Sequence, residues 1–174
     1  MKTSELILLL ATIVAALMAG LFYAYSCSVV PGLGRLPDLE YLNAMQSINR
    51  AILNPLFLCC FMGALLLLPL GTWTAYRTGG LTTRCWLLLL ATAAYVLGVF
   101  GVTITGNVPM NEALDKLVLD NSTADQLRMH RAAFESRWNT LNHVRTVFAV
   151  LALVFAVLAC ISRTAVRTGI RIQE

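Results

Sequence analysis

Side chains that can bind or activate a ligand are concentrated near the carboxyl end of the chain. If residues 138–146 form a helix, the polar and aromatic members of this stretch fall within one arc of about 160° at 100° per residue. They are Trp138, Asn139, Asn142, His143, Arg145 and Thr146. The set combines a guanidinium, two amides and an imidazole, which bind polar groups and, for the imidazole, exchange a proton near neutral pH.

Further polar side chains stand at the ends of three other, mostly apolar stretches. These side chains are Ser26, Arg50, Asn54, Asn107 and Asn111. If the stretches are membrane spans, all five groups lie at the level of the 138–146 face. Polar groups at membrane depth are unfavourable and are functional candidates for that reason. We therefore predict a binding site that all four stretches share at one rim of a helical bundle.

Each of these groups also has a purely structural interpretation. Asparagines cap helices, arginines extend to lipid headgroups, and a tryptophan anchors a helix at the membrane interface. The convergence of six or more such groups at one level favours a site. Arg145 favours it most, because the uncharged run that follows, 146–162, is short for a membrane span and places Arg145 near the membrane core.

His143 is the candidate base, because it is the only side chain of the set that titrates near neutral pH. The other histidine, His130, lies about 20 Å away along a continuous helix, so the two cannot share a metal or a haem within one chain. The sequence has no HExxH motif and no carboxylate pair of the di-iron type. We predict a site with no metal and no cofactor.

The elements that must position these groups are four long stretches with almost no charge. Only 13% of the residues are charged, against roughly 25% in soluble domains. Each stretch is close to the roughly 17–25 residues that a membrane helix needs. The sequence predicts a single all-α domain, 1–174, that forms a four-helix transmembrane bundle. The predicted spans are about 5–28, 54–76, 85–107 and 140–162.

Local signals set the limits of the helices. Residues 38–53 have apolar side chains at helical spacing, which predicts an amphipathic helix at the outer interface. Asn54-Pro55 is a favourable helix start, whereas Pro31-Gly32 and Pro109 are expected to end the first and third spans. No Gly or Pro interrupts the chain from Ser122 to about Arg167, which predicts one helix of roughly 40 residues.

The distribution of charge predicts how the bundle lies in the membrane. Both termini and the 76–84 loop are rich in Lys and Arg, which predicts a plasma or inner membrane protein with both termini cytoplasmic. The first stretch is longer than a signal-peptide core, so we expect it to be retained. The net charge of +4 fits anionic lipid and does not indicate nucleic acid. The five cysteines show no CxxC spacing and are expected to be packing residues.

Three segments resemble the DUF1772 family, which includes the anthrone oxygenases. They are Met45–Arg50 followed by Asn54–Phe57; Thr105–Asn111; and Trp138 with Asn142–Thr146. The order of the motifs, the length and the four spans agree over nearly the whole chain. The resemblance implies a small membrane enzyme that uses O2 as co-substrate to convert an anthrone to an anthraquinone without an evident cofactor.

The resemblance also implies roles for the candidate residues. His143 would remove the acidic methylene proton of the anthrone, and Arg145, Asn107 or Asn142 would stabilise the resulting oxyanion. Trp138 would stack on the flat substrate. The remaining substrate-binding candidates are Ser26, Arg50, Asn54 and Asn111.

Two other classes of function fit the same residues. The chain can be a non-catalytic membrane protein that binds a quinone, a lipid or a similar hydrophobic small molecule at this rim. It can also be a helper subunit that docks a partner through the helix 123–137. The sequence leaves open the substrate and whether the chain forms a homo-oligomer.

Overall fold

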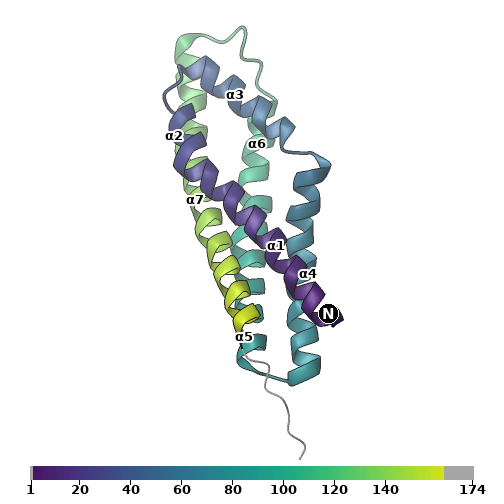
Figure 1. The fold of residues 1–174 in the computed structure, drawn as a ribbon. Coiled ribbons are helices and arrows are strands. Elements are labelled where there is room, and N and C mark those ends of the chain that lie inside the picture. Colours follow the sequence, from purple (N-terminus) through teal and green to yellow (C-terminus); the bar gives the residue numbers. More distant parts are fainter. Residues whose placement is uncertain (1, 163–174) are drawn as a thin grey trace, which may run out of the picture.

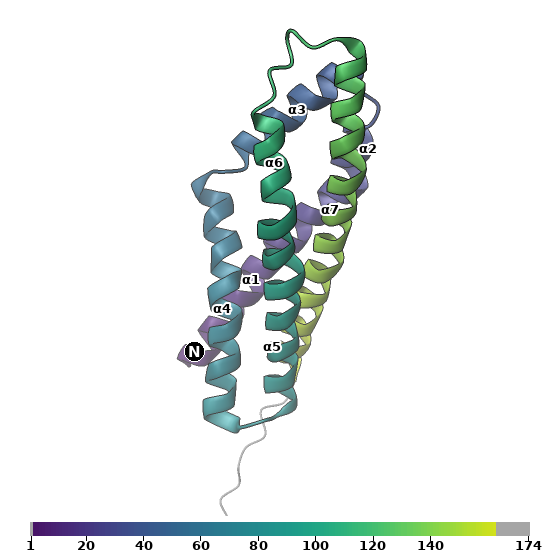
Figure 2. The same ribbon diagram turned by 180° about the vertical axis from the view of Figure 1, so that it is seen from behind.

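The chain folds as a bundle of long helices. The computed structural model describes residues 2–162 and contains no strand in that range. Four helices are long and apolar enough to cross a membrane. A shorter helix lies across one end of the bundle (Figures 1 and 2). The predicted all-α fold with four spans, an amphipathic helix and an extended last helix is confirmed.

Two of the long helices contain π-helical segments, labelled η. The first comprises α1 (Thr3–Ala24), η1 (Tyr25–Val29) and α2 (Val30–Leu33), and the amphipathic helix α3 (Asp38–Ala51) follows it. The second span is α4 (Pro55–Gly79). The third comprises α5 (Thr83–Ala93), η2 (Ala94–Gly101), η3 (Thr103–Asn107) and α6 (Val108–Asp115), and the last is α7 (Ala124–Ile161). The 163–167 end of the predicted 40-residue helix lies outside the described residues.

The two prolines that were expected to end spans do not end them. Pro31 and Pro109 each lie inside a continuous helix, in the first turn after a π-helical segment. A proline lacks an N–H donor and conflicts with the carbonyl four residues earlier. That carbonyl belongs to Cys27 or Thr105, and both residues lie in π segments, where the backbone bonds to i+5 instead of i+4. The wider π turns avoid the conflict with the carbonyl, so each helix continues past its proline.

Side-chain caps fix the starts of the last three long helices. The Asn54 side chain accepts hydrogen bonds from the backbone N–H groups of Leu56 and Phe57, as expected for an N-cap before proline. Thr123 and Gln126 form a reciprocal capping box at the start of α7. The N-cap is therefore Thr123, one residue after the predicted Ser122, and the helix begins at Ala124.

Small side chains bring the spans close together. Among the fully buried residues are alanines of α1, α4, α5 and α7: Ala11, Ala64, Ala91, Ala152 and Ala156. Small residues at these positions let helix backbones approach each other in a membrane. α1 crosses the bundle obliquely and packs on both α4 and α7 (Figure 1). Among the described glycines, Gly98 has the least space, because an added Cβ would overlap the Phe148 ring.

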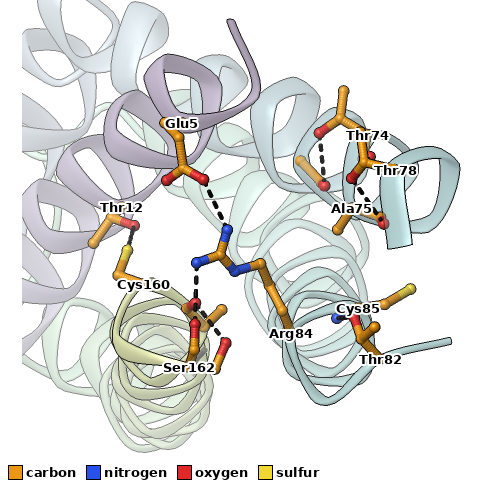
Figure 3. Close-up of polar contacts among 12 residues, drawn as sticks. Glu5, Thr12, Thr74, Ala75, Thr78, Thr82, Arg84, Cys85, Cys160 and Ser162 are labelled. Atoms are coloured by element: carbon orange, nitrogen blue, oxygen red, sulfur yellow. Dashed lines mark hydrogen bonds and ion pairs between the residues drawn. The ribbon is translucent and has the colours of Figure 1, made fainter. Parts of the chain in front are cut away.

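One end of the bundle is held by Arg84, at the start of α5. Its guanidinium donates to the Glu5 carboxylate at 2.9 Å and to the Ser162 carbonyl at 3.1 Å, as Figure 3 shows. The second contact places a cation at the carboxyl end of α7, where the helix dipole is negative. Arg84 therefore joins α1, α5 and α7 at this end.

The opposite end, which carries α3, is held by Arg131 of α7. The Arg131 guanidinium donates to the carbonyls of Gly34 and Leu36 and to the Asp38 carboxylate, at 2.7–3.0 Å. It also covers the ring of Tyr41 at 4.5 Å. Burial, with Glu135 nearby, raises the pKa of Tyr41 above its ordinary value. This cluster fixes the turn into α3 against α7.

Candidate functional site

A cavity of about 320 Å³ lies at the α3 end of the bundle. All four long helices and α3 contribute to its lining. Its apolar walls come from Leu21, Phe22, Tyr25, Ile48, Ile52, Leu53, Phe57, Val108 and Trp138. Its polar lining comes from Asn49, Arg50, Thr103, Asn111, Glu112, Asp115, Lys116, Asn142 and Arg145. Half of the lining residues are polar or charged, but most of the lining surface is apolar, as is typical of a small-molecule site.

Arg145 is the charged group most deeply enclosed in this cavity. The residue is only 7% exposed, and its guanidinium lies 4.7 Å from the Phe22 ring and 5.4 Å from the Trp138 ring. Its Nη2 donates to the Asn142 side-chain oxygen at 3.0 Å. Nε is buried without a hydrogen-bond partner. Within residues 2–162 no carboxylate pairs with Arg145.

A hydrogen-bond network behind Arg145 ties α7 to the π segment η1. The Asn142 amide donates to Ser26 Oγ at 3.0 Å, and Ser26 Oγ lies 2.7 Å from Thr146 Oγ1. The Thr146 hydroxyl has two backbone carbonyls as acceptors, those of Phe22 and Asn142. The Asn142 oxygen is therefore held toward Arg145 by contacts on both sides of its amide.

The remaining polar contacts around the cavity fix two further helix pairs. Trp138 Nε1 donates to the Asn111 side-chain oxygen at 2.8 Å, which joins α7 to α6. Arg50 Nε donates to Asp115 at 2.6 Å, which joins α3 to α6. Both partners of this ion pair are well exposed, at 62% and 46% of their side-chain surface, so it lies near the surface end of the cavity.

Five of the nine residues predicted from sequence line this cavity. They are Arg50, Asn111, Trp138, Asn142 and Arg145. Ser26 does not line it but contacts Asn142. The roles of these residues remain predictions.

Besides Ser26, three of the predicted residues do not line the cavity. His143 is exposed, and its Nδ1 lies 3.2 Å from Ser26 Oγ. Asn54 uses its side chain to cap α4. Asn107 is 1% exposed, and neither amide atom has a partner in the described part of the chain. His143 follows Asn142 by one residue, so the helix turns it about 100° away from Asn142.

The structure adds lining residues that the sequence did not single out. Asn49 lies within the Met45–Arg50 segment, four residues after Met45 and hence on the buried side of α3. Phe22 precedes Ser26 by four residues and shares its helix face, so this spacing could have identified Phe22 as a lining residue. Glu112 and Asp115 were missed because the third span was expected to end at Pro109, which placed both residues beyond the end of the span.

The fold and the cavity define a class, a small helical membrane protein with an amphipathic cavity at one end of its bundle. The model of the family described as anthrone oxygenase matches residues 44–155. This range covers more than half of the chain and includes every segment on which the resemblance depended. The chain belongs to the anthrone oxygenase family, and its four apolar helices make it an integral membrane protein. No curated protein and no solved structure matches it.

Proposed function

We propose that this protein uses O2 to oxidise a hydrophobic, anthrone-type substrate in the cavity beside Arg145. The observation that supports this most is the enclosed guanidinium, which lies over two aromatic rings in a cavity whose surface is mostly apolar. Such a cavity accepts a flat aromatic molecule and directs a positive charge at its oxygen. Family membership supports the same class of substrate.

The reaction converts a methylene carbon into a carbonyl carbon. Loss of one methylene proton gives a delocalised aromatic oxyanion, which Arg145 stabilises. The anion gives an electron to O2, and recombination of the two radicals forms the C–O bond of a peroxide, which takes up a proton. Loss of the second C–H proton then breaks the O–O bond, and the departing hydroxide leaves as water. The substrate supplies all four electrons, so the electron balance requires no cofactor.

Glu112 is our proposed proton acceptor for the first step. It is one of two carboxylates in the cavity lining, and the other, Asp115, is paired with Arg50. Within residues 2–162 Glu112 has no ion-pair partner. His143, the base expected from the sequence, lies outside the lining. A base must come within hydrogen-bond reach of the proton that it removes, directly or through one water.

We further propose that the cavity faces the periplasm or cell exterior and that both termini are cytoplasmic, in the plasma or inner membrane. Lys2, Arg77 and Arg84 gather at the opposite end of the bundle and support this orientation. The other terminal charges, Arg163, Arg167, Arg171 and Glu174, lie outside the described residues. Reporter fusions at each terminus test the orientation, and an external C-terminal reporter would contradict it.

Oxygen consumption by the purified protein with an anthrone tests the function. We expect consumption of one O2 per anthraquinone formed, and about a hundredfold loss of rate in Arg145→Gln, as for removal of one oxyanion donor. Arg77→Gln is the matched control, because Arg77 is exposed at the other end of the bundle. Saturable anthrone binding without oxygen-dependent product would show a binding protein instead of an oxygenase.

A further inference from the structure

The charges around the cavity balance except at one residue. Two cations, Arg50 and Lys116, and two carboxylates, Glu112 and Asp115, line the cavity, and all four are exposed. Arg145 is the fifth charged residue of the lining. It is also the only charged residue in the buried class within residues 2–162. The enclosed part of the cavity therefore carries one positive charge without a protein counter-ion.

An enclosed cation without a counter-ion is unfavourable unless something compensates it. The Phe22 and Trp138 rings offset part of this by cation–π attraction. The Asn142 oxygen adds one hydrogen bond from a neutral amide. Neither contact neutralises the charge. An anionic atom of a bound ligand would neutralise it.

The walls limit which anion can occupy the cavity. Leu21, Ile52, Phe57 and Val108 are among the lining residues, so most of the ligand surface must be apolar. The volume of about 320 Å³ is at the lower end of the range for small-molecule sites, which suits a single compact molecule. The Phe22 and Trp138 rings beside Arg145 favour an aromatic ligand.

We propose that the cavity binds its ligand as a planar aromatic monoanion whose negative oxygen contacts the Arg145 guanidinium. This inference rests on the proposed function in assigning the same cavity to the substrate, but it concerns binding and does not require turnover. It defines the ligands as phenols, enols or carboxylic acids with an otherwise apolar aromatic body. A neutral quinone of the same shape is the weaker ligand.

A hydroxyanthraquinone provides a direct readout, because its colour changes when the phenol ionises. An opposite charge a few ångströms from an acid typically lowers its pKa by about 1–3 units. The probe is 2-hydroxyanthraquinone, titrated with the full chain in non-ionic detergent, and empty micelles give the reference. We expect the protein to lower the pKa of the bound probe by at least about one unit. We expect Arg145→Gln to abolish that shift and Arg145→Lys to retain part of it.

Two further ligands, tested with the wild-type protein alone, distinguish the effect of ligand charge on affinity from the effect of ligand shape. Unsubstituted 9,10-anthraquinone has the same ring system without an acid, and anthraquinone-2-carboxylate is ionised throughout the titration. We expect the carboxylate to bind at least about tenfold more tightly than the neutral quinone, which corresponds to about 1.4 kcal/mol. Equal affinities, or an equal probe pKa in wild type and Arg145→Gln, would overturn the proposal. The ligand comparison remains decisive if the Arg145 variants do not fold.

The outcomes for this inference and for the proposed function are separate. A lowered probe pKa without oxygen-dependent turnover would retain the anion site and reject the oxygenase. Turnover of an anthrone without any preference for anions would retain the oxygenase and reject the anion site.

Discussion

At the scale of single residues, Asn107 is a polar side chain buried where it lowers the stability of the fold. It is enclosed in the third span, yet both polar atoms of its amide lack partners among the described residues. An unsatisfied buried polar group typically costs about 1–3 kcal/mol. Residues that are unfavourable for stability are often kept at functional sites. Asn107 therefore stays a functional candidate although it does not line the cavity.

We expect Asn107→Leu to raise the free energy of unfolding by about 1–2 kcal/mol, because the leucine removes the unsatisfied amide at similar volume. We expect oxygen consumption with an anthrone to fall in the same variant. Thermal unfolding in detergent and the oxygen electrode measure the two effects. A loss of stability would show that the amide has a partner, such as a buried water.

Glu112→Gln tests the proton acceptor. We expect the variant to slow anaerobic exchange of the anthrone methylene protons with deuterated solvent by about a hundredfold, the lower end for general base catalysis. Exchange without O2 isolates the first step from the oxidation. Proton NMR of the anthrone measures the rate.

His143→Ala is the comparison variant for this experiment, because the imidazole is exposed and outside the cavity lining. We expect it to slow exchange far less than Glu112→Gln does. The opposite order would assign the proton transfer to His143, as the sequence alone suggested.

At the scale of helices, the sequence predicted which segments are helical better than where they end. Charge-free runs and the Asn54-Pro55 start are strong local signals. The residues of the segment itself decide whether it can cross lipid and whether its first turn is capped. The continuation through Pro31 and Pro109 had no such signal, since a π turn depends on tertiary packing. This one error also left the carboxylates of α6 out of the predicted site.

Gly98→Ala tests the packing between the third span and α7. An added Cβ would overlap the Phe148 ring, so the helices must separate or the ring must move. We expect a loss of about 1–3 kcal/mol in unfolding free energy, as for other overpacked sites. Gly20→Ala is the matched control, because nothing lies within 4 Å of its added Cβ. Equal thermal stability of the two variants would contradict the close approach.

At the scale of the whole molecule, the two ends of the bundle carry different features. The Arg84 end joins three helices through an ion pair and a carbonyl contact. The α3 end contains the cavity and the enclosed Arg145. The sequence predicted the polar rim at this end, because its groups recur at the ends of separate spans. It did not predict which side chains turn inward, since this depends on how the helices are rotated against one another.

Arg84→Met tests whether the two ends of the bundle act independently. The substitution removes two charge-assisted hydrogen bonds from a side chain that is 14% exposed. We expect a loss of about 2 kcal/mol of stability, moderated because Glu5 is partly exposed. The kcat/KM of the folded protein should stay close to wild type. A large change in KM would show that the two ends are coupled.

α7 runs from Ala124 to Ile161 without a glycine or a proline. Sharp helix kinks arise at prolines, glycines and π-bulges, and α7 has none of these. The helix is thus a stiff rod. Its own Arg131 attaches it to the turn before α3, and Arg145 lies about four turns further along. A force that displaces the first turns of α7 would therefore tilt the whole helix and move the Arg145 guanidinium.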